Sequence, residues 1–258
     1  MKIAVLYICT GKYNQFFSGF YESSEKYFMN GLADLEYFVF TDDMTLNLSE
    51  KVHLYKRECK GFPLDSLFRF DMFLSIREEL SHFDYVFFFN ANMQFVAPVE
   101  REFLPEKENI MAVISPGYYD KPAFLYPYER NKKSAAYILP FKGPYHYYMG
   151  SLNGGKTADY IRLIESCSQN IHADYDSGYV AIYHDESHLN RYMFEHACLG
   201  LSPAYAYPED SNIPYIPKII LRNKVKIDKY FDKGRDHSLT GRMKKAFVTL
   251  YRIINWYI

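Results

Sequence analysis

Apolar and polar positions along the chain alternate in a way that is typical of a mixed α/β protein. Continuous apolar runs predict strands, and apolar residues at helical spacing predict the helices between them. The predicted strands cover residues 2–10, 36–41, 52–56, 85–89 and 111–114, and the predicted helices cover residues 13–28, 67–80, 157–167 and 186–195. The strand at 85–89 is apolar throughout, so we expect it at the centre of the sheet. Ligands of open α/β sheets bind beyond the carboxyl ends of such strands.

The chain of 258 residues, 48% of them apolar, is long enough to bury a full core. No repeat or low-complexity linker interrupts the sequence before about residue 217. We therefore predict one folded domain over residues 1–217, a mobile basic segment over residues 218–238 and an amphipathic helix over residues 239–258. The N-terminal apolar run is too short to span a membrane and lacks a convincing cleavage site, so we interpret it as the first strand.

Charge is distributed unevenly, although the formal net charge is only -1. Residues 218–258 carry 11 Lys or Arg and 3 Asp, a charge of +8, which leaves -9 on residues 1–217. A basic end on an acidic body predicts an anionic partner such as a phosphate or a membrane surface; the alternative is a solvated tail without a partner.

The predicted C-terminal helix carries apolar residues on one face, namely Met243, Phe247, Leu250, Tyr251, Ile254, Tyr257 and Ile258. Basic and polar residues fall largely elsewhere on the helix. This pattern is typical of a basic interfacial helix that lies on an anionic membrane. Docking of the apolar face on the protein, or on a second copy, is an equally open alternative.

Four cysteines are scattered without the spacing of a zinc or redox motif, namely Cys9, Cys59, Cys167 and Cys198. We interpret them as small apolar residues of a protein in a reducing compartment. His184 and His188 stand four residues apart, but Glu186 is not in the position that a zinc metalloprotease motif requires, and no third ligand is evident. We therefore expect no zinc site at these two histidines.

The strand at 85–89 is followed by Asn90, Ala91 and Asn92. Many enzymes that use nucleotide-sugars have Asp-Xaa-Asp at this place, and its carboxylates bind the divalent metal of the diphosphate. Amide oxygens are weak ligands for a hard cation. The sequence therefore predicts a site that keeps this geometry but has lost most of its metal affinity; alternatively, the two amides only cap the end of a strand.

Four further motifs follow in order: PYERNKKSAAYI at 127–138, YYMGSLNGGKT at 147–157, YHDESHLNRY at 183–192 and LSPAYAYPE at 201–209. Together they resemble glycosyltransferase family 6, which includes the histo-blood-group A and B transferases and the α1,3-galactosyltransferases. The most specific motif is HDESHLN, and the resemblance covers nearly all of residues 1–226. The Asn-Xaa-Asn replacement resembles the bacterial branch of the family, whose members work without metal.

The resemblance implies a GT-A fold, a single Rossmann-like domain with a mixed sheet. It also implies transfer of galactose or N-acetylgalactosamine from a UDP-sugar, with retention of configuration and an α1,3 linkage. The acceptor is expected to be a galactose-terminated glycan of a bacterial surface polysaccharide, with or without a 2-fucose. A lipid-linked acceptor predicts a cytoplasmic enzyme, or one bound peripherally to the inner face of the cytoplasmic membrane. No nucleic acid partner is expected.

Two alternatives remain beside this assignment. One is an N-acetylgalactosamine-specific transferase of the same family. The other is a non-catalytic relative that binds a sugar or nucleotide, in which loss of the metal carboxylates reflects decay.

The resemblance implies that Glu186 is the catalytic carboxylate at C1 of the donor sugar. From the residues alone, Asp185 and Glu186 are equally well explained as the acidic cap and first turn of a helix. Donor and nucleotide contacts are implied for Ile8, Cys9, Thr10, Tyr13, Arg69, Asn90, Ala91, Asn92, Met149, Gly150, Ser151, Asp185, Lys224 and Lys226. Acceptor contacts are implied for Ser115, Tyr183, His184 and Glu209.

Arg69 is expected near the uridine and diphosphate, with a surface salt bridge as the alternative. The GSLNGG segment at 150–155 is expected beside the donor sugar, with an ordinary turn as the alternative. In the family that the sequence resembles, members with a bulky residue at the position of Met149 and one larger than glycine at that of Ser151 tend to use galactose, so the resemblance implies galactose rather than its 2-acetamido analogue. Lys224 and Lys226 are expected to neutralise the diphosphate in place of a metal.

Overall fold

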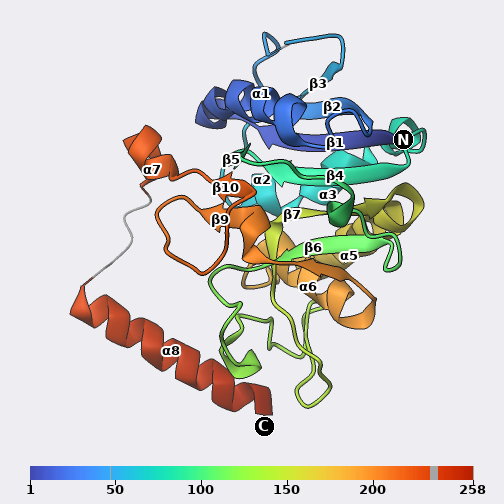
Figure 1. Ribbon diagram of the computed structural model, residues 1–258. Coiled ribbons are helices and arrows are strands. Elements are labelled where there is room, and N and C mark those ends of the chain that lie inside the picture. Colours follow the sequence, from blue (N-terminus) through green and yellow to red (C-terminus); the bar gives the residue numbers. More distant parts are fainter. Residues whose placement is uncertain (47, 233–237, 258) are drawn as a thin grey trace.

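A seven-stranded mixed sheet forms the centre of the computed structural model, which describes residues 1–46, 48–232 and 238–257 (Figure 1). Its strands follow the order β3-β2-β1-β4-β7-β6-β8, so β4 lies in the middle, as its apolar sequence predicts. Strand β7 is antiparallel to both of its neighbours, and the other pairs are parallel. The strands are β1 Lys2–Cys9, β2 Asp34–Thr41, β3 Val52–Lys56, β4 Tyr85–Asn90, β6 Ile110–Ile114, β7 Tyr148–Lys156 and β8 Leu199–Leu201.

A second, three-stranded sheet begins just after the carboxyl end of β4. Its order is β5-β10-β9, and its strands are β5 Met93–Phe95, β9 Tyr207–Pro208 and β10 Ile219–Leu221. Because β10 pairs with β5, the residues after β10 lie beside the turn at Asn92. The backbone N–H of Arg222 donates to the carbonyl oxygen of Asn92 at 2.8 Å.

Helices cover both faces of the central sheet, because strands that are apolar throughout must bury both faces. One face packs against α1, and the other packs against α2 to α6. The α-helices are α1 Phe17–Tyr27, α2 Leu64–Leu67, α3 Arg69–Leu74, α4 Arg77–Leu80, α5 Thr157–Asp176, α6 His184–Glu195, α7 Lys224–Ile227 and α8 Leu239–Tyr257. Short 3-10 helices cover Gly11–Phe16, Arg101–Phe103, Ala123–Leu125, Pro203–Ala206 and Lys229–Phe231.

The single helix predicted over residues 67–80 is wrong, because the segment is divided into α2, α3 and α4. The backbone leaves the helical conformation at Phe68 and Ile76, whose ψ angles are 25° and 22°. The Phe68 ring lies 5.4 Å from the ring of His172, and Ile76 is buried in the core. Tertiary packing at these two residues outweighs the helical preference of the segment.

The GSLNGG segment belongs to strand β7, so the alternative of an ordinary turn is wrong. A Cβ atom on Gly154 would lie 2.4 Å from the carbonyl oxygen of Val86, and one on Gly155 would lie 2.2 Å from that of Asn109. Only glycine allows the neighbouring backbones to approach this closely. The antiparallel direction of β7 places its first residues beside the carboxyl end of β4.

The last helix, α8, docks on the protein near its end (Figure 1). Trp256 is 1% exposed and packs in an aromatic cluster with Tyr126, Tyr128, Ile138 and Tyr147. Many other apolar side chains of the helix are exposed, namely Met243, Phe247, Val248, Leu250, Tyr251, Ile254 and Tyr257. The helix thus docks through Trp256, which lies outside the predicted apolar face, and contact of the exposed side chains with a membrane stays a prediction.

Parts of the predicted C-terminal regions, residues 233–237 of the basic segment and Ile258 of the helix, lie outside the described residues. Within the ranges that the structure describes, no helix combines the length and the apolar character needed to cross a membrane.

Candidate active site

Residues from both halves of the chain meet at one edge of the central sheet. Ile8 pairs with Asn90 across β1 and β4, and Phe89 pairs with Leu152 across β4 and β7. The start of β7 in turn contacts the start of α6. This edge therefore brings together the ends of the strands and the motif HDESHLN, as the sequence predicts for an α/β ligand site.

The carboxylate of Glu186 is fixed by two hydrogen bonds. The backbone N–H of Gly150 donates to Oε2 at 2.6 Å, and the hydroxyl of Tyr147 donates to Oε1. A Cβ atom at position 150 would lie 3.1 Å from the Cβ of Glu186 and 3.3 Å from Oδ2 of Asp185. The absence of a side chain at Gly150 therefore lets β7 approach both acids closely.

Asp185 forms a buried ion pair with Arg69. The Nε atom of Arg69 lies 3.0 Å from Oδ2 of Asp185, and its Nη1 donates to the carbonyl oxygen of Gly150 at 2.9 Å. The guanidinium also lies over the ring of Phe88, 4.8 Å from its centroid. The alternative of a surface salt bridge is therefore wrong, because Arg69 and Asp185 are both buried. Through these contacts Arg69 joins α3 to α6 and β7.

The two neighbouring carboxyl groups share an environment that disfavours negative charge. Burial raises the pKa of Asp185 to about 7, while Arg69 opposes the rise and Glu186 adds to it. Burial also raises the pKa of Glu186, against the lowering effects of the Tyr147 hydroxyl, the Gly150 N–H and Arg69. Perturbed carboxyl groups that lie together are typical of functional sites.

Asn90 and Asn92 bind each other and the C-terminal segment. The Nδ2 atom of Asn90 donates to Oδ1 of Asn92 at 2.9 Å, and Nδ2 of Asn92 donates to the carbonyl oxygen of Arg222 at 2.9 Å. Ala91 is buried between them, and its carbonyl accepts a hydrogen bond of 2.7 Å from the Tyr7 hydroxyl. The turn thus offers amide and backbone groups, which suit hydrogen bonding better than metal ligation. Among the described residues, no three His, Cys, Asp or Glu side chains are arranged to hold a metal ion.

The segment after β10 lies against residues 8–13, the loop at the end of β1 that contains the expected nucleotide contacts Ile8, Cys9, Thr10 and Tyr13. Nζ of Lys224 donates to the hydroxyl of Tyr13 at 3.1 Å and lies over its ring at 5.0 Å. Lys12 forms an ion pair of 2.6 Å with Asp228, and the rings of Tyr13 and Phe231 lie 4.8 Å apart. These contacts hold the C-terminal segment beside the loop.

Two predicted site residues have protein partners outside this loop. Lys226 forms an ion pair with Asp210. Glu209 forms an ion pair of 3.2 Å with Arg222 and accepts a hydrogen bond of 2.7 Å from the backbone N–H of Asn223. Of the two predicted diphosphate cations, Lys224 therefore contacts the nucleotide loop and Lys226 contacts the end of β9.

The sequence model of glycosyltransferase family 6 matches residues 1–231. The chain belongs to glycosyltransferase family 6. It is 38% identical over 226 residues to the O-antigen biosynthesis glycosyltransferase WbnI of Escherichia coli, a match that covers 87% of this chain and 95% of that protein.

Vertebrate members are also similar to the chain. Globoside alpha-1,3-N-acetylgalactosaminyltransferase 1 of Gallus gallus is 32% identical, over 92% of this chain and 70% of that protein. Histo-blood group ABO system transferase 1 of Rattus norvegicus is 32% identical, over 77% of this chain and 58% of that protein. Membership of family 6 agrees with the GT-A-like fold and makes the protein a glycosyltransferase, which uses a nucleotide-sugar donor and a glycan acceptor.

The acceptor residues predicted for this family 6 protein lie in two places. Ser115 donates its backbone N–H to the carbonyl oxygen of Tyr147 at 2.9 Å. Tyr183 is exposed and precedes α6, and His184 begins α6 with a φ of 50° and contacts the ring of Phe62. Ser115 is therefore linked directly to the residue that holds Glu186, and Tyr183 and His184 lie just before Glu186 in the chain. Glu209 lies with Arg222, as described above.

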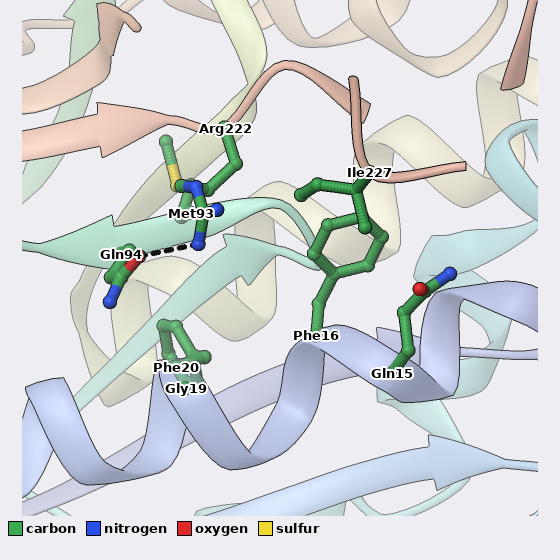
Figure 2. Close-up of a pocket in the computed structure, with 8 residues that line it drawn as sticks. All are labelled: Gln15, Phe16, Gly19, Phe20, Met93, Gln94, Arg222 and Ile227. Carbon is green, nitrogen blue, oxygen red and sulfur yellow. Dashed lines mark hydrogen bonds between the residues drawn. The ribbon is translucent and has the colours of Figure 1, made fainter. Parts of the chain in front are cut away.

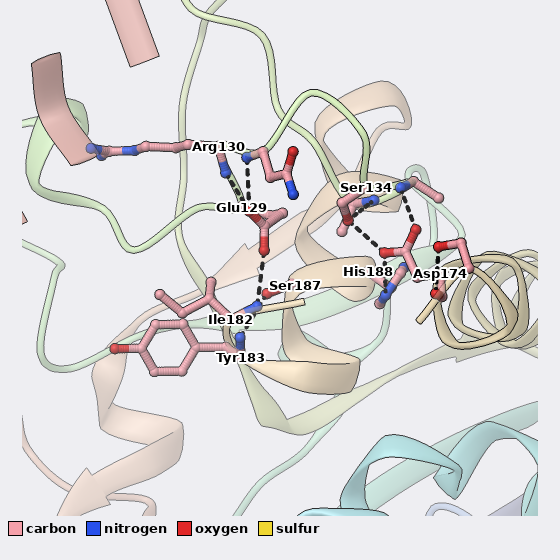
Figure 3. Close-up of polar contacts among 12 residues, drawn as sticks. Glu129, Arg130, Ser134, Asp174, Ile182, Tyr183, Ser187 and His188 are labelled. Atoms are coloured by element: carbon pink, nitrogen blue, oxygen red, sulfur yellow. Dashed lines mark hydrogen bonds and ion pairs between the residues drawn. The ribbon is translucent and has the colours of Figure 1, made fainter. Parts of the chain in front are cut away.

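A buried polar network supports the turn that precedes α6 (Figure 3). Glu129 accepts a hydrogen bond of 2.9 Å from the backbone N–H of Ile182, and Ser187 accepts one of 3.0 Å from that of Tyr183. His188 is buried 3.6 Å from Asp174, and burial lowers its pKa to about 4 although Asp174 opposes the change. His188 is therefore neutral at physiological pH, and neither of its ring nitrogens forms a hydrogen bond among the described residues.

A cavity of about 160 Å³ lies between α1 and the β5–β10 pair (Figure 2). Arg222 borders it and donates to Oε1 of Gln94 at 2.9 Å. A larger hollow of about 720 Å³ lies by Met1 and Thr157, at the opposite edge of the sheet from the carboxylates. Within the described part of the chain, none of the predicted donor or acceptor residues lines either space.

Sequence reasoning missed two residues that shape the site. Tyr147 holds Glu186, and Glu129 holds the turn before α6. Both residues lie inside motifs that carry the family resemblance, YYMGSLNGGKT and PYERNKKSAAYI. The motifs were therefore a signal for these residues, but only the folded structure gives their partners.

Proposed function

We propose that the protein is a metal-independent, retaining α1,3-glycosyltransferase that moves galactose from UDP-galactose to a galactose-terminated glycan. The observation that carries this proposal is the carboxylate of Glu186, fixed between the Gly150 N–H and the Tyr147 hydroxyl at the ligand-binding edge of the sheet. A retaining transfer needs a group on the sugar face opposite the leaving diphosphate. Glu186 takes this role, either attacking C1 or stabilising an oxocarbenium-like centre.

The remaining site residues bind and orient the donor in this proposal. Asp185 binds sugar hydroxyls. Arg69 keeps the Asp185 carboxylate and the Gly150 carbonyl in place. The amides Asn90 and Asn92 bind the donor by hydrogen bonds. The Lys224 ammonium stabilises the negative charge that develops on the departing diphosphate, a role that a metal ion has in other transferases.

Galactose is the proposed donor sugar because family members with a bulky residue at the position of Met149 and a residue larger than glycine at that of Ser151 tend to use galactose. The second candidate is N-acetylgalactosamine, which the name of the Gallus gallus relative favours.

A donor and acceptor screen tests these assignments. We expect turnover with UDP-galactose and a soluble galactose-terminated acceptor, with or without 2'-fucose, and the same rate in EDTA. Loss of turnover in EDTA that manganese restores would contradict the metal-independent mechanism. A preference for UDP-N-acetylgalactosamine would favour the second candidate, and Met149→Ala with Ser151→Gly should increase use of that donor.

Glu186→Gln is the matched test of the catalytic carboxylate. Glutamine keeps the size of the side chain but lacks the negative charge, and its single amide oxygen can accept only one of the two hydrogen bonds. We expect turnover to fall by orders of magnitude while UDP-galactose still binds. Near-normal turnover in this variant removes Glu186 from the mechanism, and absence of turnover in the wild type with every donor favours a non-catalytic relative.

We further propose that the acceptor is a lipid-linked glycan and that the enzyme acts on the cytoplasmic side of the membrane. The O-antigen relative of Escherichia coli supports this acceptor class. The charge of +8 on residues 218–258 and the exposed apolar side chains of α8 support peripheral contact with an anionic membrane.

A further inference from the structure

We propose that helix α8 supports catalysis by positioning a residue of the site. Trp256 packs on Tyr128, Tyr128 packs on Tyr147, and the Tyr147 hydroxyl orients the Glu186 carboxylate. The proposal rests on the proposed role of Glu186. The match to family 6 ends at residue 231, so α8 lies outside the matched part of the chain.

Tyr147 connects the carboxylate to an aromatic cluster. Its hydroxyl donates to Oε1 of Glu186, and its ring lies 5.1 Å from the ring of Tyr118 and 5.6 Å from that of Tyr128. The side chain is 2% exposed. A phenol is rigid, so packing around the ring determines where the hydroxyl lies.

Tyr128 connects Tyr147 to the C-terminal helix. Its hydroxyl donates to the carbonyl oxygen of His146 at 2.6 Å, next to Tyr147 in the chain. Its ring lies 6.1 Å from the ring of Trp256, and its own carbonyl accepts a hydrogen bond of 2.7 Å from Nη2 of Arg252. Tyr128 therefore contacts both the helix and the segment that carries Tyr147.

Trp256 is bound on several sides. Its indole N–H donates to the carbonyl oxygen of Ile138 at 2.6 Å, the guanidinium of Arg130 lies over its ring at 4.7 Å, and its ring lies 5.5 Å from that of Tyr145. Arg252 and Trp256 are four residues apart, so they lie on the same face of the helix. This face binds the aromatic cluster, while the apolar side chains from Met243 to Tyr251 stay exposed.

Loss of the Trp256 side chain leaves a space beside Tyr128 and Tyr145, into which the cluster can shift. The Tyr147 hydroxyl then no longer holds Glu186 in one orientation. Trp256 and Tyr128 are thus positioning residues, which act on the reaction only through Tyr147.

The pH profile reports this contact. The titratable and charged groups that face Glu186 are Tyr147, Tyr118, Asp185 and Arg69, and Tyr183 lies next to Tyr147 and Tyr118. The Tyr147 hydroxyl lowers the pKa of Glu186 against the effect of burial. Removing or displacing that hydroxyl therefore raises the pKa further and moves the acid limb of the pH profile to higher pH.

The test compares Tyr147→Phe, Trp256→Ala and the double variant with the full-length wild type, using UDP-galactose and a soluble acceptor. Tyr147→Phe should lower kcat about ten- to a hundredfold, the effect of losing one hydrogen bond to a charged group, with little change in donor KM. Trp256→Ala should lower kcat about tenfold and move the acid limb in the same direction. The double variant should be no slower than Tyr147→Phe, because both changes remove the same contact.

Tyr251→Ala is the matched control, because it removes an exposed aromatic side chain from the same helix, and its kcat should equal that of the wild type. If Trp256→Ala lowers the melting temperature but leaves kcat and the pH profile unchanged, or if the two losses multiply, the proposal is wrong. Should Trp256→Ala fail to fold, Trp256→Phe keeps an aromatic ring but removes the N–H bond to Ile138, and the same comparisons apply.

A second readout does not depend on turnover. The Glu186 carboxyl can be titrated by carbon-13 NMR in the protein without substrate, where Tyr147→Phe and Trp256→Ala should both raise its pKa and Tyr251→Ala should not. A wild type that turns over no donor contradicts the proposed function alone, since this titration still tests the coupling. An unchanged Glu186 titration in Trp256→Ala overturns the coupling itself.

Discussion

Asp185→Asn should stabilise the protein at neutral and higher pH, although the same change should weaken donor binding. The side chain of Asp185 is 4% exposed, and burial raises its pKa from 3.8 to about 7. Because the pKa is higher in the folded state, the carboxyl contributes its full stability only below the unfolded pKa of 3.8, and this stability is lost as pH rises through about 7.

The size of the effect follows from the two pKa values. A difference of about 3 between them corresponds to about 4 kcal/mol in the free energy of unfolding. Asparagine keeps an oxygen that can accept from Nε of Arg69 but cannot ionise, so it imitates the protonated acid at every pH. Glu186 titrates in both proteins, and its contribution therefore largely cancels in the comparison.

Urea unfolding of both proteins between about pH 4 and about pH 8 measures this difference. The stability of Asp185→Asn relative to the wild type should rise by about 4 kcal/mol across that range. Asp176→Asn, which changes an exposed aspartate at the end of α5, is the control and should change the stability little, because exposed substitutions usually do. A difference for Asp185→Asn that is equal at both ends of the range refutes the reasoning.

Two further predictions concern the basic C-terminal region. Lys224→Ala should weaken UDP-galactose binding about tenfold or more, because it removes a charged hydrogen-bond donor. Lys226→Ala should have a smaller effect, because Lys226 is paired with Asp210. Calorimetric titration measures both affinities, and equal affinities for Lys224→Ala and the wild type contradict the role of Lys224. Replacing the exposed Phe247 and Tyr251 by serine should reduce sedimentation with anionic liposomes, while turnover of a soluble acceptor should be retained; unchanged sedimentation contradicts membrane contact through this face.

The central part of the fold could be predicted from the sequence because it depends on local patterns. The apolar run of β4 predicts a central strand, and β4 lies in the middle of the sheet. The breaks at Phe68 and Ile76 could not be predicted, since they arise from packing against distant residues such as His172. Likewise, the glycines of β7 suggested close backbone approach, but only the pairing with β4 and β6 identifies a strand.

The candidate site divides in the same way. Glu186 and the two amides were found because each belongs to a short motif. The partners of these residues are far away in the sequence: Arg222 binds Asn92, and Arg69 binds Asp185. The sequence around Arg69 is compatible with a buried ion pair and with an exposed one, so the residues of α3 alone could not show which of the two forms.

The C-terminal helix illustrates this limit and changes how its functions can be separated. Its exposed apolar residues fit the predicted interfacial helix, but the residues that anchor it are Arg252 and Trp256, and Trp256 lies outside the predicted apolar face. If both proposals hold, deletion of α8 removes membrane contact and the support of Tyr147 together, so a deletion cannot separate the two roles. Point changes at Phe247 and Tyr251 therefore test membrane contact alone, whereas changes at Trp256 test the coupling to catalysis. If each face of α8 has its own function, changes at Phe247 and Tyr251 should reduce liposome binding but not turnover, and changes at Trp256 should reduce turnover but not liposome binding.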